Sequence, residues 1–98
     1  MPVLLRFTSP GFTAEKYNET VRLLEEAGQG APAGRTYHVC WGPKDNLRVS
    51  DIWESKEAFE KFSQTLGPIL DKLGVTGEPE FIEIYNIIEG AKAASTAT

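Results

Sequence analysis

Three residues in the middle of the chain have the types and the spacing to do chemistry. His38 lies in a β-forming segment, residues 35–42, and Asp51 and Trp53 lie two apart in the next such segment, residues 47–54. A carboxylate beside an imidazole orients the ring and stabilises the charge that it gains on accepting a proton. Such a pair is the minimum from which a general base can be built at neutral pH, so His38 and Asp51 are our candidate catalytic residues.

The two segments must form a hairpin whose register brings these side chains together. If residues 43–46 form a four-residue loop, His38 lies opposite Asp51; a two-residue turn at 45–46 places His38 opposite Trp53 instead. Side chains alternate along a strand, so either even-length loop puts all three on one face of the sheet. An odd-length loop would separate the histidine from the other two. We expect the even case.

The same residues also have purely structural interpretations. The histidine and the aspartate can form a cross-strand polar pair that only satisfies its own hydrogen bonds. Trp53 can pack in the core as readily as it can stack on a ligand. Tyr85 can offer its hydroxyl to a ligand or simply pack against neighbours. One cysteine and one histidine, Cys40 and His38, are too few for a zinc site, and we expect no metal and no cofactor.

The surrounding sequence predicts the elements that would position these residues. Thr13 and Ser55 are N-cap residues, each followed by apolar residues at helical spacing. Gly67-Pro68 interrupts the second stripe, which predicts a separate short helix over residues 68–73. The predicted strands are residues 2–8, 35–42, 47–54 and 80–88.

This order of elements predicts an α+β fold of the ferredoxin-like, split βαβ type. Such a fold has an antiparallel four-stranded sheet with both helices on one face. Its other face would carry apolar and aromatic side chains without a cover, which predicts a homodimer formed through the two sheets. We expect one domain over residues 1–90 and a disordered tail over residues 91–98.

Composition excludes several classes of function. The net charge is −4 and there is no basic stripe, so nucleic acid and anionic membranes are not expected partners. No apolar run approaches the ~20 residues of a membrane helix. The N-terminus lacks the pattern of a signal peptide. A single cysteine cannot form an internal disulfide, and we expect a cytoplasmic protein.

A family resemblance rests on the run Val49-Ser50-Asp51-Ile52-Trp53-Glu54-Ser55-Lys56-Glu57-Ala58-Phe59. An acidic residue, a spacer, an aromatic residue, a helix cap and an Ala-aromatic helix start follow one another in it. The run resembles the dimeric α/β-barrel superfamily, especially its antibiotic-biosynthesis-monooxygenase-like branch. The order of elements is similar to that family over residues 2–89.

The resemblance implies a dimeric α/β barrel with a ligand pocket between each sheet and its helices. Asp51, Trp53 and His38 would line that pocket, with Phe62 and Tyr85 as further ligand-binding candidates. Many members have a histidine where this chain has Phe62, and haem-degrading members have a tryptophan there, so haem degradation is disfavoured.

Two hypotheses about function follow. In the first, the protein is a monooxygenase-like enzyme that acts on a small aromatic or enolisable substrate by proton abstraction or cofactor-free oxygenation. In the second, the same pocket holds a small hydrophobic ligand without turnover, or the chain is an accessory dimeric protein.

Overall fold

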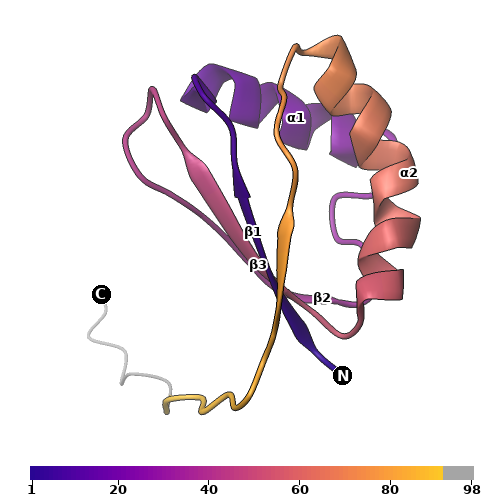
Figure 1. Ribbon diagram of the computed structural model, residues 1–98. Helices are drawn as coiled ribbons and strands as arrows, with labels where there is room; N and C mark the ends of the chain where they lie inside the picture. Colours follow the sequence, from indigo (N-terminus) through magenta and orange to yellow (C-terminus); the bar gives the residue numbers. More distant parts are fainter. Residues whose placement is uncertain (92–98) are drawn as a thin grey trace, which may run out of the picture.

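The computed structural model describes residues 1–91, and six helices and strands follow one another along them (Figure 1). Their bounds are β1 (Val3–Thr8), α1 (Ala14–Glu26), β2 (Arg35–Trp41), β3 (Arg48–Trp53), α2 (Lys56–Lys72) and β4 (Glu80–Glu83). The predicted tail lies, from residue 92 onward, outside the described residues. None of the described helices is long and apolar enough to cross a membrane.

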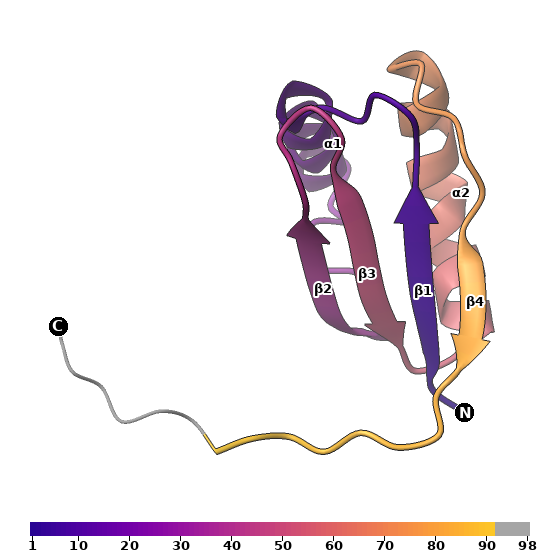
Figure 2. The ribbon, with the colours of Figure 1, turned by 60° about the vertical axis from the view of Figure 1, so that its left-hand side comes forward.

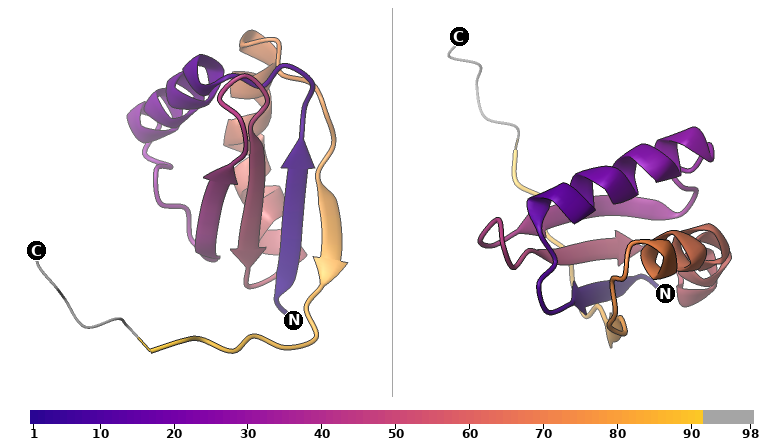
Figure 3. Two further views of the ribbon diagram at one scale, coloured as in Figure 1. Left: turned by 90° about the vertical axis from the view of Figure 1, so that its left-hand side faces the viewer. Right: turned by 90° about the horizontal axis from the view of Figure 1, so that it is seen from above.

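The four strands form one antiparallel sheet in the order β2-β3-β1-β4. Both helices cover the same face of this sheet, and Figure 2 shows the other face open toward the viewer. The view from above in Figure 3 separates the helix layer from the sheet layer. The predicted ferredoxin-like α+β fold is confirmed.

The hairpin between β2 and β3 has the register of the four-residue loop. His38 pairs with Asp51 and Cys40 with Val49, as the four-residue alternative predicts, and not in the register of the two-residue turn. The loop is closed by a hydrogen bond of 2.9 Å from the Asn46 backbone N–H to the Pro43 carbonyl. The histidine and the aspartate therefore face the helices together.

The predicted helix starts are confirmed, and the predicted break in the second helix is wrong. Thr13 and Ser55 each accept a hydrogen bond of 3.1 Å from the backbone N–H three residues ahead. However, α2 continues through Pro68, without a separate helix over residues 68–73. Pro68 is exposed, whereas Leu66 and Ile69 on either side pack against the core, so packing of the apolar stripe outweighs the lost backbone hydrogen bond.

The last strand is shorter than predicted and ends at Glu83 rather than at residue 88. It pairs with β1 from Arg6↔Glu80 to Val3↔Glu83, and the ladder ends there, at the first residue of β1. One bond of 3.4 Å, from the Ile84 N–H to the Pro2 carbonyl, continues the contact. Residues 84–91 then leave the sheet as an extended segment (Figure 1).

Two apolar clusters lie between the sheet and the helices. The larger is aromatic, and Trp53, 0% exposed, lies at its centre, with ring centroids 5.5 Å from Phe59 and 5.4 Å from Phe62. The smaller cluster is built on Phe12, Leu47 and Val75 at the other end of the layer.

Candidate functional site

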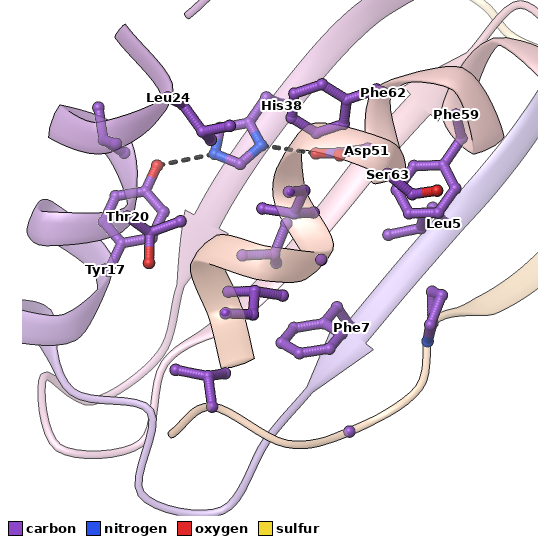
Figure 4. A pocket seen from close by; sticks show the side chains of 18 of the residues that line it. Leu5, Phe7, Tyr17, Thr20, Leu24, His38, Asp51, Phe59, Phe62 and Ser63 are labelled. Atoms are coloured by element: carbon purple, nitrogen blue, oxygen red, sulfur yellow. Dashed lines mark hydrogen bonds and ion pairs between the residues drawn. The ribbon is translucent and has the colours of Figure 1, made fainter. Parts of the chain in front are cut away.

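A cavity of about 490 Å³ lies between the sheet and both helices, next to the two apolar clusters. Most of its walls are apolar, and α1, α2, β1, β2 and β3 all contribute to them (Figure 4). A mostly apolar cavity with a few convergent polar groups is the usual form of a small-molecule site. The side chains that bring polar or charged groups to it are Tyr17, Thr20, Arg35, His38, Asp51, Ser63 and Asp71.

His38 and Asp51 form the central contact of the site. Their positions on adjacent strands bring His38 Nδ1 within 2.6 Å of Asp51 Oδ1. The aspartate is only 5% exposed, although its side chain ends in a charge. A buried charge of this kind is stable only where its oxygens are hydrogen-bonded.

Trp53 supplies the second hydrogen bond to this carboxylate. Its indole Nε1–H donates to Asp51 Oδ2 over 3.2 Å, two residues along the same strand. An ionised carboxylate can only accept hydrogen bonds, so the imidazole of His38 must donate from Nδ1. In the neutral ring this leaves Nε2 as an acceptor on the cavity side.

Tyr17 occupies that acceptor and completes a hydrogen-bonded chain from helix to sheet. Its hydroxyl lies 2.7 Å from His38 Nε2, with the two rings nearly parallel at an interplanar angle of 5°. Because Nε2 accepts, the phenol donates. Figure 4 shows the two contacts of the imidazole on opposite sides of the ring.

The environment keeps the phenol of Tyr17 in its neutral form. Burial raises its pKa above the ordinary tyrosine value, and the charges of Cys40 and Asp51 act in the same direction, while Arg35 opposes them. The neutral phenol is therefore the resting form of Tyr17. When the phenol oxygen accepts a proton from a ligand, its own proton can pass to Nε2, and Asp51 stabilises the resulting imidazolium.

The structure brings some of the predicted site residues together and places others elsewhere. His38, Asp51 and Phe62 line the cavity. Trp53 does not, because its ring is enclosed in the core, where it contacts Asp51 rather than open space. Tyr85 is fully exposed beyond the end of β4.

Tyr17 is the site residue that the sequence analysis did not single out. It lies on the apolar stripe of α1, where it looked like a packing residue. One partial signal was present, because Tyr17 is the only one of the three tyrosines on a helix stripe, and such a stripe faces the sheet.

Within residues 1–91, no three histidine, cysteine, aspartate or glutamate side chains are grouped so that they could hold a metal ion. Cys40 is half-buried on the helix side of β2, and burial raises the pKa of its thiol. That environment disfavours a reactive thiolate.

No protein-family model matches the sequence, and no curated protein matches it either. Solved structures do resemble it. A candidate antibiotic biosynthesis monooxygenase from Deinococcus radiodurans is 16% identical, with a TM-score of 0.58, over 94% of this chain and 100% of that one. SnoaB, a cofactor-independent oxygenase from Streptomyces nogalater, is 17% identical, with a TM-score of 0.58, over 91% of this chain and 96% of that one.

A dimeric ferredoxin-like protein from an uncultured marine organism is similar to the same extent. It is 15% identical, with a TM-score of 0.58, over 91% of this chain and 93% of that one. At such identities the likeness establishes the shared fold. The resemblance to antibiotic-biosynthesis-monooxygenase-like proteins is thus confirmed at the level of the fold.

Proposed function

We propose that this protein is a small-molecule enzyme that removes a proton from a phenolic or enolisable aromatic substrate. The observation that carries the proposal is the hydrogen-bonded chain Tyr17–His38–Asp51, which ends at an apolar cavity of about 490 Å³. Each member of this chain is paired, which holds the three groups in fixed positions, and the proposed proton transfer runs from the cavity toward the buried carboxylate.

The proton moves in two linked steps. The substrate binds with its acidic O–H or C–H at the Tyr17 oxygen, which accepts that proton while its own passes to His38 Nε2. The positive charge on the imidazole is stabilised by Asp51 across 2.6 Å. The apolar walls exclude water, which strengthens this interaction and leaves an electron-rich carbanion or phenolate in the cavity.

Oxygenation is the chemistry that we propose for that anion, because the structurally similar SnoaB is described as a cofactor-independent oxygenase. For a CH₂ group beside a carbonyl, the carbanion adds dioxygen to give a peroxide anion. A proton returned from His38 through Tyr17 makes the hydroperoxide. Loss of water then leaves a C=O group, so one oxygen atom enters the product, the other enters water, and dioxygen is the oxidant.

We further propose that two copies assemble through the open face of the sheet, as the dimeric α/β barrel requires. Four exposed apolar or aromatic side chains lie there, namely Tyr37, Val39, Trp41 and Ile82. A patch of this kind on a small sheet is typical of an interface. The dimeric neighbour with the same fold supports a second copy as its occupant.

Proton abstraction can be tested separately from oxygenation. The probe is 2-tetralone, whose CH₂ between the aromatic ring and the carbonyl is enolisable, and the measurement is its deuterium uptake in D₂O by NMR under nitrogen. We expect the protein to accelerate exchange above the buffer rate and His38→Gln to abolish the acceleration. Tyr37→Phe is the matched control, since that side chain lies on the same strand and faces away from the cavity.

The outcomes separate the two hypotheses about function. Exchange that His38→Gln leaves unchanged would exclude His38 as the base. Shifted protein resonances on addition of 2-tetralone, with no accelerated exchange, would make the protein a ligand-binding module instead of an enzyme.

A further inference from the structure

A β-bulge near the start of β2 turns a charged side chain toward the cavity. Tyr37 pairs with Ile52, but the next pair is Arg35 with Trp53, so the partner strand has no residue opposite Thr36. Thr36 Oγ1 instead donates to the Ile52 carbonyl over 3.2 Å. Without the bulge, strict alternation would point Arg35 to the same open face as Tyr37. With it, the arginine shares the helix side with Trp53. Bulges commonly re-aim side chains next to functional sites.

The guanidinium of Arg35 lines the cavity beside the aromatic wall. Its Cζ lies 6.0 Å from the centroid of the Phe62 ring, and Nη2 donates to the Gly30 carbonyl over 3.2 Å. Within residues 1–91, no carboxylate lies within 4.0 Å of it. The positive charge also acts at Tyr17, where it opposes the rise of the phenol pKa.

The two acidic groups at the cavity do not neutralise this arginine. Asp51 is committed to His38 and Trp53. Asp71 is exposed near the C-terminal end of α2, where it contacts water. The cavity therefore presents a cation with unused donors on one wall and a hydroxyl, that of Tyr17, on another.

We propose that Arg35 binds a carboxylate on the substrate, so that the ligand is an aromatic hydroxy acid or its keto form. This rests on the proposed function, because it places the reacting hydroxyl at Tyr17 and the acid group at the guanidinium. A planar carboxylate matches the fork of one arginine in a bidentate contact. A phosphate group normally receives several backbone N–H donors at a helix start as well. Here a single guanidinium lies among mostly apolar walls, which suits a carboxylate better than a phosphate.

The test compares two ligands that differ by one carboxylate. They are 2-naphthol, neutral at pH 7, and 6-hydroxy-2-naphthoate, each titrated calorimetrically into wild type, Arg35→Gln, Arg35→Lys and Arg48→Gln. We expect wild type to bind the acid at least ~10-fold more tightly than the phenol, from a charge-assisted contact. Arg35→Gln should abolish the ratio, Arg35→Lys should keep part of it, and Arg48→Gln, a change on the open face, should keep all of it.

Each outcome decides one question. A wild type that binds the phenol but binds the acid no more tightly overturns the role of Arg35 and leaves the proposed function standing. A wild type that binds neither ligand counts against the aromatic site itself. The expected result also requires Arg35→Gln to keep the wild-type affinity for 2-naphthol, so a general loss of folding cannot imitate it. A ratio that survives in folded Arg35→Gln also overturns the proposal.

Discussion

Asp51 is the residue on which the geometry of the site depends, because its two oxygens receive hydrogen bonds from two different rings. His38 donates to Oδ1 and Trp53 to Oδ2, and the carboxylate is 5% exposed. A group that accepts twice in the core can be replaced only by another double acceptor. The aspartate therefore links the packing of the core to the chemistry of the cavity.

We predict that Asp51→Asn lowers the stability of the core and also removes the activity at the cavity. An amide has one oxygen and one NH₂, so either the Trp53 N–H or the His38 Nδ1 would face a donor. An unsatisfied buried donor costs about 1–3 kcal/mol in the free energy of unfolding. If the imidazole adopts the other tautomer instead, Nε2 carries the proton and cannot act as a base. We expect urea unfolding to show the loss of stability and 2-tetralone exchange to fall to the buffer rate.

A fully active Asp51→Asn variant would contradict this assignment, even if its stability were reduced. Ser50→Ala is the control, because that residue is the neighbour on the same strand and faces the open side of the sheet.

Tyr17 makes a second prediction, through its ionisation. Burial raises the pKa of its phenol, so the folded state retains this proton at pH values where the unfolded chain has lost it. The corresponding stability is fully present below the ordinary tyrosine pKa of about 10, and it is lost as pH rises from there through the raised value. Wild type should therefore lose stability above pH 10 more steeply than Tyr17→Phe in urea titrations.

The same variant tests the proton path. Because the hydroxyl passes the proton in the proposed path, we expect Tyr17→Phe to reduce 2-tetralone exchange. Exchange that is unchanged or faster would mean that the hydroxyl only covers His38 Nε2. Tyr37→Phe, which removes an exposed hydroxyl, should match wild type in both the pH series and the exchange assay.

Among single residues, the sequence predicted that His38 and Asp51 meet between two strands, and it missed the contact of His38 with Tyr17 on α1. Strand alternation and an even-length loop predicted that His38 and Asp51 share a face, and the structure selects the four-residue loop, in which the two residues pair directly. No local rule sets the rotation and position of α1 above the sheet, so the partner of His38 Nε2 could not be derived in the same way. Trp53, whose role was left open between core and ligand, is enclosed by Phe59 and Phe62.

The elements show where local signals yield to tertiary contacts. Gly67-Pro68 is a strong local signal for a helix end, yet α2 is continuous because its apolar side packs against the core across that point. β4 differs from its prediction for the opposite reason. Its sequence favours a strand to residue 88, but its ladder with β1 ends at the pair Val3↔Glu83, and residues 85–88 pair with no strand of the described sheet.

We predict that Gly67→Ala stabilises the protein. Gly67 lies inside α2 without positive φ, and a Cβ built on it meets nothing within 4 Å apart from its chain neighbours, of which Pro68 is one. Glycine in a helix interior costs about 0.5–1 kcal/mol relative to alanine, so the free energy of unfolding should rise by about that amount. Urea unfolding measures the change.

Gly34→Ala is the matched control and should have the opposite sign. Gly34 has φ +91°, and its added Cβ would lie 2.6 Å from the Cβ of Ala58 at the start of α2. The strained backbone and the overlap both destabilise the folded state. A Gly67→Ala variant no more stable than wild type would mean that contact between the new Cβ and the Pro68 ring cancels the gain in helix propensity.

At the scale of the whole molecule, the helices protect only one side of a thin sheet. On the other side, Tyr37, Val39 and Trp41 are exposed from the single strand β2. The guanidinium carbon Cζ of Arg48, on β3, lies 5.4 Å from the centroid of the Trp41 ring. The extended segment after β4 adds Ile87 and Ile88 to the exposed apolar surface. In a chain of 98 residues this is a large apolar area to leave in water, which is the physical basis for proposing a dimer.

We predict that Val39→Lys converts a dimer into a monomer without unfolding it. Val39 is 38% exposed in the single chain, so a lysine there remains hydrated in the monomer, whereas between two sheets its charge would be buried without a partner. That penalty should weaken dimerisation at least ~100-fold.

Sedimentation velocity at micromolar concentration should give wild type twice the chain mass of 10.8 kDa and the variant the mass of one chain. Gln64→Lys, on the exposed side of α2, makes the same +1 change in charge and should remain dimeric. A wild type that sediments as one chain at these concentrations would contradict the dimer, while the cavity, which lies on the helix side of the sheet within one chain, would still allow the proposed chemistry.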